Sequence, residues 1–93
     1  MSYKDEPGVV YLLHFDRPYR HARHYLGWTA DLPGRLESHA RGHGARLLEV
    51  VSRAGIGWTV ARVCWGKTKK FERQIKNRGG LARFCPLCKE ERK

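Results

Sequence analysis

The stretch VVYLLHFDRPYRHARHYLGW, residues 9–28, contains the two apolar runs that determine the fold. Residues 9–15 are β-branched, aromatic or leucine-rich and follow a Pro-Gly turn signal, which predicts a strand. Residues 24–28 predict a second strand, in which Gly27 marks a bulge or a close approach of another group to the backbone. The polar segment between the runs is too long for a two-residue hairpin turn, so we expect a loop joining antiparallel strands.

Three helices and one more strand are expected after residue 28. The predicted helices span residues 29–42, 44–55 and 67–80, and the predicted third strand spans residues 56–66. The order ββααβα predicts a small α+β domain with a three-stranded antiparallel sheet flanked by helices. A chain of 93 residues allows one domain, 1–93, with its core at about 8–78 and a C-terminal tail at 79–93.

The charge balance is the most informative bulk property. Nineteen Lys and Arg residues oppose nine Asp and Glu residues, which gives a formal net charge of +10. A small domain this basic is typical of proteins that bind a polyanion, and nucleic acid is the leading candidate; a solvated basic surface is the alternative. No apolar run approaches the ~18 residues of a membrane span, and the N-terminus lacks the pattern of a signal peptide. We therefore expect a cytoplasmic protein that does not act at a membrane.

Five polar residues fall where the predicted fold can bring them together. Tyr11 and Tyr25 lie on the two strands of the predicted hairpin, so their phenols can meet. Arg35 and His39 are four residues apart and share one helix face. Glu72 lies beside the apolar stripe of the last helix in a chain that has few acidic residues. Taken singly, each residue also fits an ordinary packing or surface role.

Together these residues resemble the GIY-YIG nuclease family. VVYLL is followed by HYLGWT, then by the Arg35 and His39 pair, then by Glu72. The first tripeptide, residues 9–11, keeps the tyrosine but replaces the glycine and isoleucine, and the second tripeptide is Tyr-Leu-Gly at 25–27. The spacing is most similar to the compact single-domain branch of the family, and the resemblance covers most of the chain.

The resemblance implies a metal-dependent endonuclease that hydrolyses phosphodiester bonds, usually in DNA rather than RNA. Tyr11 would be the general base, and cations such as Arg35 would lower its pKa. Tyr25 would orient water or phosphate, and Arg35 would bind the scissile phosphate. His39 would hold the tyrosine or a phosphate oxygen.

The resemblance also implies one divalent ion, Mg²⁺ or Mn²⁺, bound by Glu72. Asn77, only five residues further on, is too close to match the family's later asparagine and is left unassigned. A role in DNA repair or processing fits this chemistry. Because no separate sequence-reading domain is attached, we expect weak or structure-guided specificity, and a monomer or homodimer.

The other basic residues are candidates for phosphate contacts. They are Arg17, Arg20 and Arg23 in the predicted loop, Arg41 and Arg46 around the GHG turn, and Lys67, Lys69 and Lys70 at the start of the last helix. The competing interpretation is a nucleic-acid-binding module without catalysis, which would use the same basic surface and would not need an acidic residue near phosphate.

The pair Cys85 and Cys88 forms a C-x-x-C motif in the C-terminal tail. Two cysteines are half of the four ligands of a structural zinc site, and Cys64 or a histidine could complete it, but no second pair has zinc-site spacing. Inert thiols are therefore favoured over a zinc half-site or a redox pair. A small zinc-supported interaction domain remains a third candidate function.

Overall fold

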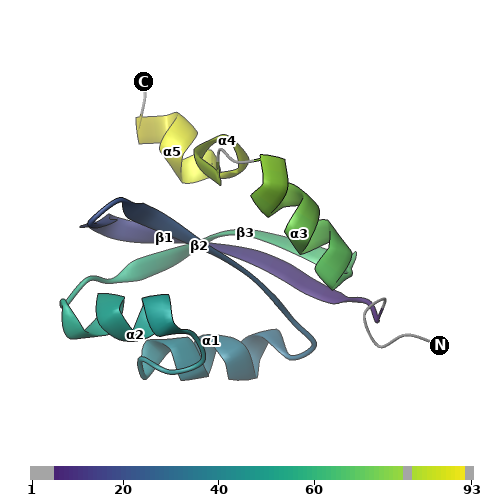
Figure 1. The fold of residues 1–93 in the computed structure, drawn as a ribbon, viewed down its shortest axis with the longest axis horizontal. Coiled ribbons are helices and arrows are strands. Elements are labelled where there is room, and N and C mark those ends of the chain that lie inside the picture. The colour runs from purple at the N-terminus through teal and green to yellow at the C-terminus, as the bar shows by residue number, and fades with distance from the viewer. Residues whose placement is uncertain (1–5, 79–80, 92–93) are drawn as a thin grey trace.

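A three-stranded antiparallel sheet in the order β2-β1-β3 forms the centre of the fold (Figure 1). The computed structural model describes residues 6–78 and 81–91. The strands are β1 (Gly8–Tyr19), β2 (Ala22–Thr29) and β3 (Trp58–Lys67). The expected α+β class with a three-stranded antiparallel sheet is thereby confirmed.

The connection between β1 and β2 differs from the expected loop. Both strands continue through the polar segment, and Tyr19 pairs with Ala22 across a turn of only two residues, Arg20 and His21. Arg20 has a positive φ of 56°, which a tight hairpin turn of this kind requires. The expectation of a long loop was wrong because residues 16–18 of β1 are exposed, so this part of the strand has no apolar alternation that would signal it.

Helices cover both faces of the sheet (Figure 1). On one face lie α1 (Leu32–Ala40) and α2 (Arg46–Arg53). On the other lie α3 (Lys69–Arg78), α4 (Leu81–Phe84) and α5 (Pro86–Glu91). The described part of the predicted C-terminal tail is thus helical and packs on the sheet. No helix in the described ranges has the length and apolar character needed to cross a membrane.

The central strand β1 is buried on both faces, because its side chains alternate between two apolar clusters. Tyr11, Leu13 and Phe15 pack with Leu48 and Val51 beneath α1 and α2. The intervening residues Val10 and Leu12 pack with Leu26, Ile75 and Cys85 beneath α3, α4 and α5. Alternate side chains of β1 therefore lie in two separate apolar cores, one on each face of the sheet.

Local signals explain where α1 begins and ends. The Asp31 side chain caps the helix by accepting a hydrogen bond of 3.2 Å from the Gly34 backbone N–H. At the other end Gly42 takes a φ of 80°, a left-handed conformation that glycine adopts without strain, and its N–H donates to the His39 carbonyl. This turn fixes the path of the chain next to His39.

Candidate active site and candidate metal centre

The first candidate site lies under α1, where the structure brings together Tyr11, Tyr25 and His39. The Tyr11 hydroxyl lies 2.8 Å from Nε2 of His39, and both side chains are 1% exposed. The Tyr25 ring lies 6.1 Å from the Tyr11 ring and 5.3 Å from the His39 ring, measured between centroids. Two paired strands and one helix thus deliver three polar side chains to one place, as the sequence predicted.

The absence of a side chain at Gly27 leaves space for the Tyr11 and Tyr25 rings to come together. It pairs with Tyr11 across the two strands, and a Cβ at Gly27 would lie 2.5 Å from the Tyr11 hydroxyl oxygen. The same Cβ would lie 2.9 Å from Cε2 of Tyr25. The close approach expected at Gly27 is therefore that of the two phenols, which fill the space a side chain would need.

The hydrogen bonds around His39 indicate which of its two ring nitrogens carries the proton. Nδ1 lies 3.1 Å from the carbonyl oxygen of His43, which can only accept, so Nδ1 carries the proton. Nε2 is then an acceptor and takes the hydrogen bond that the Tyr11 hydroxyl donates. Burial lowers the His39 pKa and the Arg35 charge lowers it further, whereas the hydrogen bond to the His43 carbonyl opposes this shift; the net lowering favours the neutral form. The site therefore presents a neutral imidazole as a proton acceptor beside a phenol.

Arg35 and Glu72 act on this group through their charges. Arg35 donates to the Gly44 carbonyl at 3.4 Å, and its positive charge lowers the pKa of both phenols. Glu72 is partly buried and lies 3.7 Å from the Lys76 ammonium, and its negative charge raises the pKa of both phenols. Glu72 therefore influences the pKa values of the two phenols from α3, which covers the face of the sheet opposite α1.

Burial changes one expectation about Tyr11. The Tyr11 pKa is raised, mainly because burial penalises the phenolate and further because of Tyr25, and the lowering by Arg35 is smaller. The expected lowering of this pKa was therefore wrong. The Tyr25 pKa is also raised, mainly by burial, although a hydrogen bond with Tyr11 opposes the shift. Both phenols are held in their protonated form.

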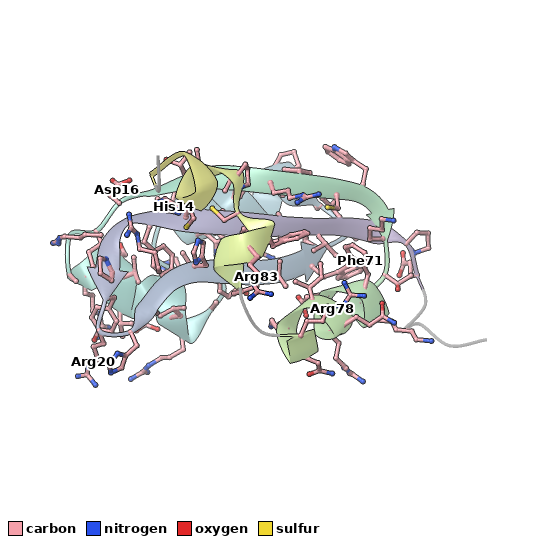
Figure 2. All side chains as sticks on the ribbon, turned by 90° about the horizontal axis from the view of Figure 1, so that it is seen from above. His14, Asp16, Arg20, Phe71, Arg78 and Arg83 are labelled. Atoms are coloured by element: carbon pink, nitrogen blue, oxygen red, sulfur yellow. The ribbon has the colours of Figure 1, made fainter. Side chains whose placement is uncertain are left out.

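The predicted phosphate-binding residues do not form one patch. Arg17, Arg20 and Arg23 lie on the β1–β2 hairpin tip, while Lys67 pairs with Gly8 at the opposite end of β1. Figure 2 shows the same separation, with Arg20 and Phe71 at opposite ends of the molecule.

Several of the predicted phosphate-binding residues contact other groups of the protein. Arg41 forms an exposed ion pair with Glu37 at 2.7 Å, and Arg17 donates to the Ala54 carbonyl. Lys67 and Lys69 lie over the rings of Phe71 and Trp28. Arg20, Arg46 and Lys70 are exposed.

A cleft of about 380 Å³ lies between α3, α4 and β3. Phe71, Ile75 and Phe84 form much of its lining, together with three arginines, Arg62, Arg78 and Arg83. The Arg62 guanidinium lies 4.3 Å from the centre of the Phe84 ring and donates to the Phe84 carbonyl. Sequence analysis missed these arginines because their convergence depends on the position of α4.

The second candidate site lies on the opposite face of β1, where His14, His24, Cys85 and Cys88 meet. One ligand atom from each residue lies within 4.8 Å of the others. His14 and His24 are paired across β1 and β2, and the cysteines flank the start of α5. Figure 2 shows His14 beneath the C-terminal helices. The sequence favours inert thiols over a zinc half-site completed by Cys64 or a histidine, and the structure brings two histidines to the cysteines.

The donor atoms suit zinc rather than Mg²⁺ or Mn²⁺. Two imidazole nitrogens and two sulfurs are a common structural zinc set, whereas Mg²⁺ and Mn²⁺ prefer oxygen. No Asp or Glu among the described residues belongs to this group. The sequence allows a histidine to complete the site but does not indicate which one, because His14 and His24 come from adjacent paired strands. The signal that could have identified His14 is its position as a polar residue on the apolar face of Val10 and Leu12.

Comparison with known protein families, with curated proteins and with solved structures finds no match to this chain.

Proposed function

We propose that this protein is a GIY-YIG-type endonuclease domain that hydrolyses phosphodiester bonds in DNA. The observation that carries the proposal is the 2.8 Å hydrogen bond between two buried polar side chains, the Tyr11 hydroxyl and His39 Nε2, with Tyr25 and the Arg35 charge beside them. Its geometry is that of a hydroxyl next to a proton acceptor, the arrangement needed for general base catalysis.

The neutral His39 removes the need for a free phenolate. When water attacks phosphorus, its oxygen forms the new P–O bond and its proton passes to the phenol oxygen. The phenol proton passes at the same time to Nε2 of His39, which becomes an imidazolium, and the P–O bond to the leaving oxygen breaks. Tyr25 is less buried than Tyr11 and would orient the attacking water or the phosphate through its hydroxyl. Arg35 offsets the charge that develops on the phosphate.

Glu72 is the residue that would hold a divalent ion. It supplies one carboxylate, and Mg²⁺ is commonly bound through one or two carboxylates together with water and substrate phosphates. Such an ion would polarise the phosphate and stabilise the leaving oxygen.

Cleavage of plasmid and oligonucleotide substrates with Mg²⁺, Mn²⁺ or EDTA tests the proposal. Tyr11→Phe and Glu72→Gln should each lower the rate by about 10²-fold or more. Glu49→Gln is the matched control, because Glu49 also forms a helical ion pair, 2.9 Å from Arg53, but lies on α2. Absence of cleavage by the wild type, with DNA binding retained, would instead indicate a binding module.

A further inference from the structure

We propose that His14, His24, Cys85 and Cys88 bind one structural zinc ion that fastens the C-terminal helices α4 and α5 to the β1–β2 hairpin. This site is separate from the proposed nuclease site, because His14 points to the face of β1 opposite Tyr11. Its failure would leave the nuclease proposal untouched, since metal content is measured without a cleavage assay.

The three distances from His14 Nδ1 to the other ligand atoms are close to those in a zinc tetrahedron. Zinc bonds to nitrogen and sulfur place two nitrogens about 3.3 Å apart, nitrogen and sulfur about 3.6 Å apart, and two sulfurs about 3.8 Å apart. The His14 Nδ1 to His24 Nε2 distance is 3.3 Å, and Nδ1 lies 3.4 Å from Cys85 Sγ and 3.6 Å from Cys88 Sγ. The His24 Nε2 to Cys88 Sγ distance is 3.1 Å, which is about 0.5 Å shorter than in such a tetrahedron, so these two side chains would move slightly apart around a bound ion.

The site is closed, which indicates a structural rather than a catalytic ion. Four protein ligands complete the coordination of zinc and leave no position for water or substrate. Cys85 is fully buried and His14 is 5% exposed, so the ion would sit inside the fold. On binding, the two thiols release their protons to solvent and the two histidines contribute neutral nitrogen lone pairs.

Helices α4 and α5 need such an anchor. They contain four and six residues, and helices this short have little stability of their own. Among the described side chains of residues 81–91, the apolar contacts with the core come from the buried Cys85 and from four partly buried side chains, Leu81, Phe84, Leu87 and Cys88. Zinc ligands on either side of Pro86 would fix both helices at their junction, and with them the Arg83 and Phe84 side of the cleft.

Zinc binding changes the hydrogen bonding of His14. With the metal on Nδ1, the remaining nitrogen Nε2 carries a proton, and Arg23 Nη2, 3.2 Å away, is also a donor. Nη2 must then turn aside, while Nε of Arg23 keeps its 2.8 Å bond to the Phe15 carbonyl.

Metal analysis of the full chain, purified under reducing conditions, tests the site directly. We expect one zinc per chain, and Co²⁺ added to the metal-free protein should give the visible absorption bands of a tetrahedral thiolate site, which Zn²⁺ then abolishes. Cys88→Ser and His24→Asn should weaken zinc binding by more than the roughly 10–100-fold loss that supporting residues cause. Cys64→Ser and His21→Asn are the controls and should leave it unchanged.

A further variant separates ligation from packing. Zinc accepts cysteine in place of histidine, so His24→Cys should retain one zinc where His24→Asn loses it. Chelation should also speed amide hydrogen exchange in residues 81–91. Zinc-free wild type without a Co²⁺ spectrum, or equal binding by Cys88→Ser and Cys64→Ser, would overturn the proposal.

Discussion

Replacing Gly27 with alanine should destabilise the fold through a collision with Tyr11. The added Cβ would lie 2.5 Å from the Tyr11 hydroxyl oxygen and 2.6 Å from its Cζ. Tyr11 is 1% exposed and its hydroxyl is hydrogen-bonded to His39, so the ring has no space into which it can move. Overpacking of this kind costs about 1–3 kcal/mol.

Gly57→Ala provides the matched control. A Cβ at Gly57 would lie 2.6 Å from the Asp16 carboxylate, which is exposed and can rotate away. Both substitutions restrict the unfolded chain similarly, a gain of about 0.4–1 kcal/mol. The difference between the two variants therefore isolates the collision. For a domain of this size, 1–3 kcal/mol corresponds to a Tm difference of about 4–24 °C.

Thermal and urea unfolding followed by circular dichroism measure this difference. The double variant Gly27→Ala with Tyr11→Leu should be less destabilised than the sum of the single changes, because the shorter side chain removes the collision. Equal stability of Gly27→Ala and Gly57→Ala, or simple additivity in the double variant, would refute the proposed packing of Tyr11 against Gly27.

Three further predictions concern pH and salt. Burial lowers the His39 pKa below 6.5, so as the pH falls the unfolded chain binds a proton at a higher pH than the folded chain does. The free energy of unfolding should therefore decrease as the pH drops below 6.5. Urea titrations should show a smaller decrease for His39→Gln. Burial raises the Tyr11 pKa above 10, so as the pH rises this phenol loses its proton at a lower pH in the unfolded chain than in the folded chain. The free energy of unfolding should therefore decrease as the pH rises above 10, and Tyr11→Phe should reduce that decrease. DNA affinity measured by fluorescence anisotropy should fall linearly with salt on a log–log plot, and Lys70→Ala should reduce the slope by about 0.9 if Lys70 contacts phosphate.

The sequence predicted the arrangement around Tyr11 well because short-range patterns determine it. Alternation places Tyr11 on a defined face of β1, the hairpin brings Tyr25 beside it, and helical periodicity puts Arg35 and His39 on one face of α1. The raised pKa of Tyr11 was not predictable in this way, since it depends on how completely neighbouring elements exclude water.

The His14 site could not be predicted because its ligands come from distant parts of the chain. His14 and Cys85 are 71 residues apart, and no spacing rule connects a strand pair to a C-x-x-C motif near the C-terminus. Their meeting depends on α4 and α5 folding back over the sheet. The hairpin tip was missed for a different reason, since Asp16, Arg17 and Pro18 are exposed and show no apolar alternation.

The burial of β1 on both faces has a consequence for how this sequence can change. Tyr11 and His14 belong to different sites yet are separated by only two residues of the same strand. One residue inserted or deleted between them would send one of the two side chains to the wrong face of the sheet. Each candidate site therefore limits the sequence changes that the other can tolerate. This part of β1 can change by point substitution, but not by insertion or deletion, without loss of one of the two sites.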